Sequence, residues 1–129
     1  MNKSIAGTAA ILGAISVALG AFAAHGLKKV LDSNLLSIVD TAVTYQFYHV
    51  FALLAVALSW QQADRTKLTW AARLFLAGIL LFCGSLYALV AVKQAGYTTL
   101  NWIAAITPVG GVCFIVGWLM LALAWLSRR

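Results

Sequence analysis

The sequence predicts an all-α fold, a polytopic membrane protein built as a compact bundle of four transmembrane helices. Four long stretches contain no Asp, Glu, Lys or Arg, at residues 5–24, 41–60, 74–92 and 94–127. The composition agrees, because 64% of the residues are hydrophobic, 9% are charged and the mean hydropathy is +0.96. A helix of about 20 residues spans ~30 Å, the thickness of the hydrocarbon core. We therefore expect one transmembrane domain over residues 1–129, with spans near 5–25, 41–60, 70–92 and 102–127.

The first span, residues 5–25, carries small side chains at i,i+4 spacing. In lipid, such residues let two helices approach each other closely. This pattern favours a central position for the first span in the bundle, and it equally suits a contact between two copies of the chain. The small residues form two ridges, one of Ala6, Ala10, Ala14 and Ala18 and one of Ser16, Gly20 and Ala24.

The second span, residues 41–60, follows a short amphipathic segment. Between residues 27 and 38, leucine and isoleucine recur near helical spacing, with charged residues between them. This pattern is typical of a helix that lies on the membrane surface. We expect such a helix here, either separate from the second span or continuous with it.

Polar side chains within the spans are the candidate functional residues, because their burial in hydrocarbon costs free energy unless they form hydrogen bonds. On the second span, Tyr45, Gln46 and His49 share one helical face. Counted from the ends of the spans, the polar residues fall into the same outer half of the membrane. The candidate residues are His25, Tyr45, Gln46, His49, Ser85, Tyr87 and Thr107.

This polar layer has two interpretations. The first is a small pocket that opens toward the outer face of the membrane and binds a ligand. The second is a hydrogen-bonded network that ties the four helices together, each bond contributing about 0.6 kcal/mol. The sequence leaves both open.

The fourth span, residues 102–127, contains the main irregularity of the chain. Pro108 lacks a backbone N–H, and Gly110 and Gly111 add flexibility, so we expect a helix break at these three residues. The span is then either kinked or begins near 107–108, with Thr107 as the N-cap. Irregular backbone at membrane depth needs protein or a cavity around it, which favours the pocket.

The charges predict the orientation. The net charge is +6, and with four spans both termini lie on one side of the membrane. An excess of Lys and Arg marks the cytoplasmic side, so we expect both termini in the cytoplasm. Basic residues divided between two sides form no patch for nucleic acid, so the expected partner is the lipid bilayer. The side of the termini holds Lys3, Arg65, Lys67, Arg73, Arg128 and Arg129, and the other side holds Lys28, Lys29 and Lys93.

Several chemistries lack the residues that they need. Cys83 and Cys113 form no C-x-x-C pair. The chain therefore lacks the cysteine pattern that zinc binding and thiol–disulfide exchange require. No span holds a central carboxylate. We therefore expect no catalytic residue, no metal and no cofactor, and a protein that is not an enzyme. An enzyme that uses His49, with Tyr45 and Gln46 beside it, is the weakest of three hypotheses.

Four motifs resemble a known family. They are residues 20–25 (GAFAAH), 45–49 (YQFYH), 84–87 (GSLY) and 107–111 (TPVGG), one in each span. Together they resemble the small four-span membrane proteins of unknown function that include bacterial YgdD and eukaryotic transmembrane protein 256. The resemblance implies a protein of the bacterial inner membrane and implies no established reaction or catalytic residue.

Two functional hypotheses lead. The first is a non-enzymatic accessory or scaffold protein whose partner is another membrane protein or a second copy of the chain. The small-residue ridges and the absence of a reactive centre favour it. The alternative is a binder or carrier of a small lipid-like or quinone-like molecule in the polar pocket, favoured by the polar layer and the irregularity at Thr107 and Pro108.

Overall fold

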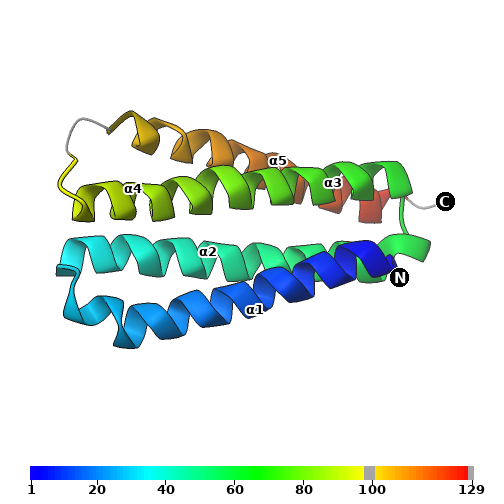
Figure 1. Ribbon diagram of the computed structural model, residues 1–129. Coiled ribbons are helices and arrows are strands. Elements are labelled where there is room, and N and C mark those ends of the chain that lie inside the picture. Colours follow the sequence, from blue (N-terminus) through cyan, green and yellow to red (C-terminus); the bar gives the residue numbers. More distant parts are fainter. Residues whose placement is uncertain (98–100, 128–129) are drawn as a thin grey trace.

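The computed structural model describes residues 1–97 and 101–127, and within these ranges every regular element is helical, as predicted. Four helical segments are long and apolar enough to cross a membrane. They run back and forth, so the N-terminus and the end of the last helix lie at the same end of the bundle (Figure 1). In chain order the elements are α1 (Lys3–His25), η1 (Leu27–Lys29), α2 (Ser33–Leu58), η2 (Ser59–Gln61), α3 (Arg65–Gly78), η3 (Ile79–Cys83), α4 (Gly84–Gln94), η4 (Asn101–Ala105) and α5 (Thr107–Leu126).

Short polar side chains form the N-caps of three helices. Asn2 caps α1, Asp32 caps α2 and Asp64 caps α3, each accepting hydrogen bonds from backbone N–H groups of the first turn. Helix α2 therefore begins at Ser33, well before the second span predicted from residue 41. The reason is that the amphipathic segment becomes helical there and continues directly into the span.

The Asp64 cap is also half of an ion pair at the end of the bundle that holds the N-terminus. Its Oδ2 lies 2.7 Å from Nζ of Lys67. The hydrogen bond from the Lys67 ammonium holds the pKa of the Asp64 carboxyl below its ordinary value. Lys67 also donates to Oγ of Ser127 over 3.0 Å, so this pair links the start of α3 to the end of α5.

Helix α2 and the rod made of α3, η3 and α4 form the middle of the bundle (Figure 1). Helix α1 packs mainly on α2, and α5 packs mainly on α3 and η3. Fully buried Leu53 and Val56 of α2 meet Leu68 and Phe75 of α3 in the main core. The prediction that the first span is central is therefore wrong.

The outer position of α1 follows from which of its small residues face the protein. Its buried residues are Ala9, Ser16 and Ala23, seven positions apart, which is the spacing of a single seam against one neighbour. Gly20, from the second predicted ridge, lies beside Val43 of α2. Ala10, Ala14 and Ala18 of the first predicted ridge are exposed on the outside of the bundle.

The third predicted span is one rod that runs from Arg65 to Gln94. The sequence did not predict the π-helical turn η3 at its centre. Such a turn contains one residue more than an α-helical turn and rotates the side chains that follow it. Phe82 and Ser85, which lie in and just after this turn, both contact α5.

Helix α5 begins at Thr107, after the short helix η4. Pro108 lies in its first turn, where a missing N–H breaks no hydrogen bond. The predicted N-cap is corrected, because Ile106 occupies that position and no side chain caps the helix. The predicted break at Gly110 and Gly111 is also corrected, since both glycines lie inside the regular helix.

Candidate functional site

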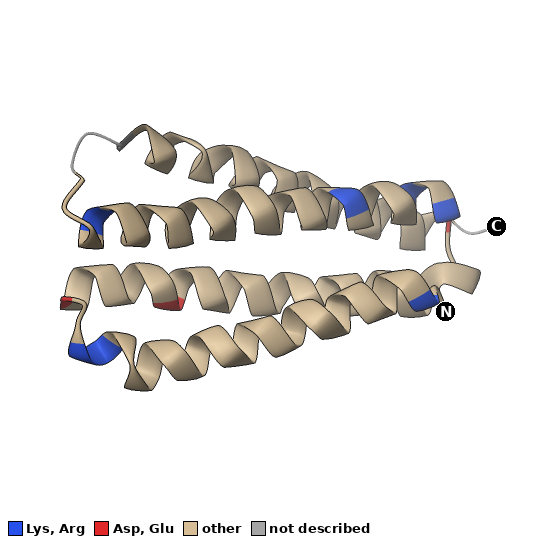
Figure 2. Ribbon diagram, viewed as in Figure 1, with Lys and Arg blue, Asp and Glu red and all other residues tan. Residues whose placement is uncertain are grey.

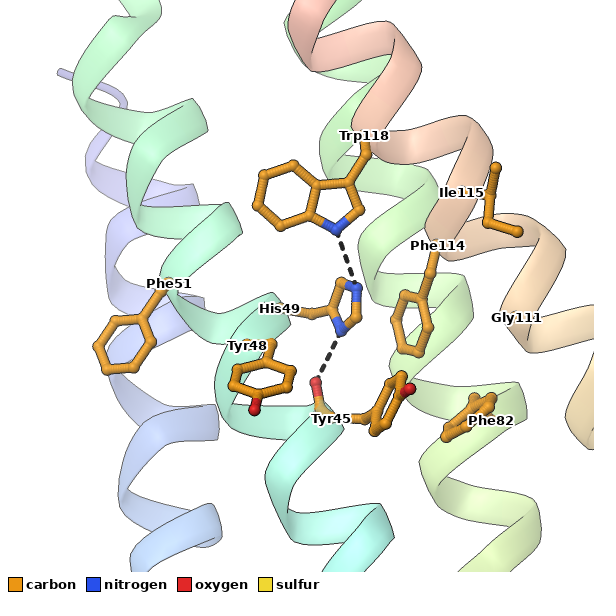
Figure 3. Close-up of a pocket in the computed structure, with 9 residues that line it drawn as sticks. All are labelled: Tyr45, Tyr48, His49, Phe51, Phe82, Gly111, Phe114, Ile115 and Trp118. Carbon is orange, nitrogen blue, oxygen red and sulfur yellow. Dashed lines mark hydrogen bonds between the residues drawn. The ribbon is translucent and has the colours of Figure 1, made fainter.

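His49 lies near the middle of α2, with 4% of its surface exposed. Nε1 of Trp118 is 3.2 Å from Nε2 of His49, and Nδ1 of His49 is 2.7 Å from the carbonyl oxygen of Tyr45 (Figure 3). An indole N–H can only donate, so Nε2 accepts and carries no proton. The proton is therefore on Nδ1, which donates it to the carbonyl. Both nitrogens of the imidazole are occupied within the protein.

Aromatic rings hold the His49 side chain on its remaining sides. The Phe114 ring stacks on the imidazole with 3.4 Å between centroids and 7° between planes. The Phe75 ring lies 5.6 Å away on the α3 side. The imidazole thus joins α2 to α5 through a stacked ring and a hydrogen bond.

Gln46 forms a second polar link, one turn from His49 on α2. Its Oε1 accepts a hydrogen bond of 3.0 Å from the Tyr87 hydroxyl, and its Nε2 donates over 3.3 Å to the carbonyl oxygen of Leu12. These bonds connect α4, α2 and α1. The amide has partners on both sides, and only 3% of its surface is exposed.

Ser85 and Thr107 form the third link, between α4 and α5. Their hydroxyl oxygens are 2.7 Å apart, and the Ser85 hydroxyl donates over 2.9 Å to the carbonyl oxygen of Phe82 in η3. Because Ser85 gives its single proton to that carbonyl, the Thr107 hydroxyl is the donor between the two side chains. Thr107 therefore joins α5 to the rod instead of capping α5.

The seven predicted residues do not form one connected hydrogen-bond network. Five of them form the three separate links, and Tyr45 contributes only its carbonyl group. The Tyr45 ring is 40% exposed and stacks on Phe82. His25 is exposed at the end of α1, and its ring nitrogen Nδ1 is hydrogen-bonded to the carbonyl oxygen of Ala21 on the same helix, so it belongs to none of the three links.

Trp118 was missing from the predicted set, although it donates the hydrogen bond that orients His49. One signal in the sequence could have found it. An indole N–H in mid-span needs an acceptor, and an unprotonated imidazole nitrogen is an acceptor that a neighbouring span could offer. The pairing of these two spans, however, comes from the fold.

Every described side-chain N or O atom that is deeply buried has a hydrogen-bond partner. The described residues also hold no group of three His, Cys, Asp or Glu side chains close enough to bind a metal ion. Cys83 is buried and Cys113 is half-buried, and both are free thiols. The deeply buried polar side chains among the described residues are thus hydrogen-bonded within the protein.

An aromatic groove opens beside these links, on the outside of the bundle between α2, η3 and α5. Its volume is about 620 Å³. The Tyr48 and Phe51 rings line one side, and Phe114 and Trp118 line the other, with His49 between them (Figure 3). The groove therefore offers flat apolar surfaces and few free polar atoms. The complete lining is Tyr45, Tyr48, His49, Phe51, Phe82, Gly111, Phe114, Ile115 and Trp118.

Comparison with known proteins yields one family and several relatives. The family described as "Protein of unknown function (DUF423)" matches residues 19–111. The UPF0382 membrane protein of Haemophilus influenzae is 46% identical over 114 residues, which cover 88% of this chain and 86% of the relative. The UPF0382 membrane protein YwdK of Bacillus subtilis is 42% identical over 119 residues, covering 88% of this chain and 92% of the relative. No solved structure matches the chain.

Proposed function

We propose that this chain, which belongs to the DUF423 family, is a non-enzymatic accessory protein of the bacterial cytoplasmic membrane. The observation that carries the proposal is the closure of its polar groups on one another. A general base needs a free lone pair, and a nucleophile needs a base beside it. His49 and Ser85 are already engaged inside the protein, which supports a structural role for both.

The exposed ridge of small residues on α1 is a suitable surface for binding a helix of another protein. Ala10, Ala14 and Ala18 lie one turn apart on α1, and among the described residues all three are exposed. Small residues at this spacing let a partner helix approach closely. In its accessory role, the chain binds another membrane protein along this ridge.

Chemical cross-linking in cells, followed by purification in mild detergent, tests the accessory role. The wild-type chain is expected to retain a defined partner, and Ala14→Trp is expected to abolish the complex by blocking close approach. Ile15→Trp places the same bulk about 100° around the helix and serves as the matched control. Loss of the partner in both variants, or in neither, contradicts a contact along the ridge.

For the orientation, we propose that both termini face the cytoplasm. Lys3, Arg65, Lys67 and Arg73 lie toward the end of the bundle that holds the N-terminus, and Lys28, Lys29 and Lys93 lie toward the other end (Figure 2). The sequence adds two arginines after α5, and the resulting excess of basic residues favours this end as the cytoplasmic one. A reporter fused after residue 129 is expected to be active only in a form that works in the cytoplasm. Activity of an exported alkaline phosphatase at that position contradicts the orientation.

A second candidate function rests on the aromatic groove. We propose a flat, ring-containing apolar molecule, such as a quinone-like compound, as its ligand, because stacked aromatic walls suit a planar partner. Gly111 lines the groove from α5, and a Cβ added there would meet Phe82 only at 3.8 Å. The substitution Gly111→Leu therefore fills the groove without disturbing the helix contact.

Native mass spectrometry on protein released from mild detergent tests the groove. A discrete extra mass on the wild-type chain that disappears in Gly111→Leu supports the ligand. Ala88→Leu adds bulk at an exposed position of α4 outside the groove and is expected to keep that mass. A bare wild-type chain, or a mass that all variants retain, contradicts a ligand in the groove.

A further inference from the structure

Arg73 is exposed on α3, at a depth where the neighbouring helices α2 and α5 carry no Asp, Glu, Lys or Arg. The ring of Phe75, two residues further along α3, lies 5.6 Å from that of His49, and a Cβ on Gly117 would lie 2.8 Å from the Phe75 ring. These contacts place Phe75 level with the middle of α2 and α5. From there α5 continues without a charge to Leu126, nine residues or ~14 Å further. Arg73 therefore lies about 10 Å inside the apolar zone.

The Arg73 side chain lies over the ring of Trp70. Its guanidinium carbon is 5.5 Å from the ring centroid. Helical side chains lean toward the N-terminus of their helix, and this contact with the residue three positions earlier shows the same direction. The guanidinium thus reaches about one turn, or ~5 Å, toward the charged end of the bundle and still lies below it.

The guanidinium charge has no anionic partner among the described residues. The ion pair found in residues 1–97 and 101–127 is that of Lys67 with Asp64. No side chain or carbonyl of these residues accepts a hydrogen bond from Arg73. A ring face attracts a cation but takes up none of its five N–H donors. A planar guanidinium with free donors fits the paired oxygens of a phosphate.

A separate groove continues from Trp70 toward the centre of the bundle. It lies between α3 and α5, is lined by Trp70, Leu74, Val116 and Met120, and has a volume of about 350 Å³. The lining is almost wholly apolar. An acyl chain fits such a groove, and a cation lies beside its Trp70 end.

We propose that Arg73, Trp70 and this groove form a binding site for an anionic phospholipid. The phosphate accepts hydrogen bonds from the Arg73 guanidinium, and one acyl chain lies along Leu74, Val116 and Met120. The lipid supplies the negative charge that the protein does not provide at this depth. The site is on α3 and α5, away from the aromatic groove, and it is independent of the proposed function.

Native mass spectrometry of the full chain with added phosphatidylglycerol or phosphatidylcholine tests this site. We expect the protein to retain phosphatidylglycerol in preference to phosphatidylcholine. Arg73→Gln is expected to weaken that retention about tenfold, because charge-assisted hydrogen bonds are lost. Lys3→Gln removes a charge near the same end of the bundle but outside the site, and is expected to bind as the wild type does. Val116→Phe keeps the charge but fills the groove, and is expected to weaken retention as well.

Three results would overturn the site. One is equal retention of phosphatidylglycerol by the wild type and Arg73→Gln. Another is an equal loss in Lys3→Gln and Arg73→Gln, which would show a general attraction of basic residues for anionic lipid. The third is a gain in thermal stability from inorganic phosphate equal to that from phosphatidylglycerol, which would assign the site to free anions.

Discussion

The two outer helices pack on the middle of the bundle in different ways. Helix α5 meets the rod through glycines that leave space for phenylalanine, since Gly78 faces the ring of Phe114 and Gly117 faces that of Phe75. Helix α1 meets α2 through a seam of small residues, and a Cβ added at its Gly13 or Gly20 would find an ordinary contact at 3.5 Å. The α5 contact is therefore closely interlocked, and the α1 contact has room for change.

The strongest test of this difference is at Gly110. A Cβ there would collide with the backbone of Phe82, which cannot move as the end of a flexible side chain can. We expect Gly110→Ala to destabilise the protein by about 2–3 kcal/mol, the cost of overpacking a tight contact. Thermal unfolding in detergent measures the effect. The control is Gly111→Ala, and an equal loss in both variants contradicts the interlocked contact.

The His49 link is expected to have the next largest effect. Trp118→Phe leaves Nε2 of His49 buried without a donor, and this costs about 1–2 kcal/mol. The measurement is again thermal unfolding, with Trp102→Phe as the control at an exposed position. An unchanged melting temperature in Trp118→Phe would show that the hydrogen bond contributes nothing to the packing of α5.

The polar link between α4 and α2 is expected to be weaker. Tyr87→Phe removes the hydrogen bond to Gln46 and leaves its buried Oε1 without that donor, which costs about 1 kcal/mol. Tyr48→Phe removes an exposed hydroxyl that makes no hydrogen bond with a described residue. Unfolding by denaturant in micelles compares the two variants, and an equal loss of stability in both would show that the bond between Tyr87 and Gln46 contributes nothing.

At Gly20 the effect is expected to reverse in sign. Alanine is a better helix former than glycine, and the space beside Val43 accepts a methyl group. Gly20→Ala should stabilise the protein by up to about 0.5 kcal/mol. A melting temperature below that of the wild type would show that the α1 contact is as tight as the α5 contact.

The smallest expected effect is at Asp64, whose ion pair with Lys67 joins α3 to the end of α5. Because the pKa of this carboxyl is lower in the folded protein, the pair stabilises the fold above the ordinary pKa of Asp. This contribution is lost as the pH falls through the folded-state pKa. The melting temperatures of the wild type and Asp64→Asn should differ slightly at pH 6 and converge at the acid end of a pH series. A constant difference would contradict the role of the charge.

The sequence predicted the four helices well because bilayer thickness limits a span to about 20 residues without charge. It did not predict which helices touch. A span that is apolar on every side has no polar face to show its orientation, so the small residues of α1 could not reveal that Ala9 faces the protein and Ala14 faces outward.

The polar candidates show the same difference between what is local and what is not. His49, Gln46 and Ser85 were predicted because a polar side chain in a span needs a partner. Their partners could not be predicted, because the Leu12 and Phe82 groups are backbone carbonyls and Trp118 comes from a distant span. The π-helical turn that directs Ser85 toward Thr107 also leaves no clear mark in the sequence.

If the buried polar side chains are hydrogen-bonded within the bundle, His49 exists as one tautomer. Nitrogen-15 NMR of the protein with labelled histidine distinguishes the two ring nitrogens, and His49→Gln assigns the signals. At neutral pH we predict a single neutral imidazole with the proton on Nδ1 and an Nε2 shift that changes in Trp118→Phe. A proton on Nε2, or a mixture of tautomers that Trp118→Phe leaves unchanged, would show that His49 is not held by the hydrogen bond from Trp118.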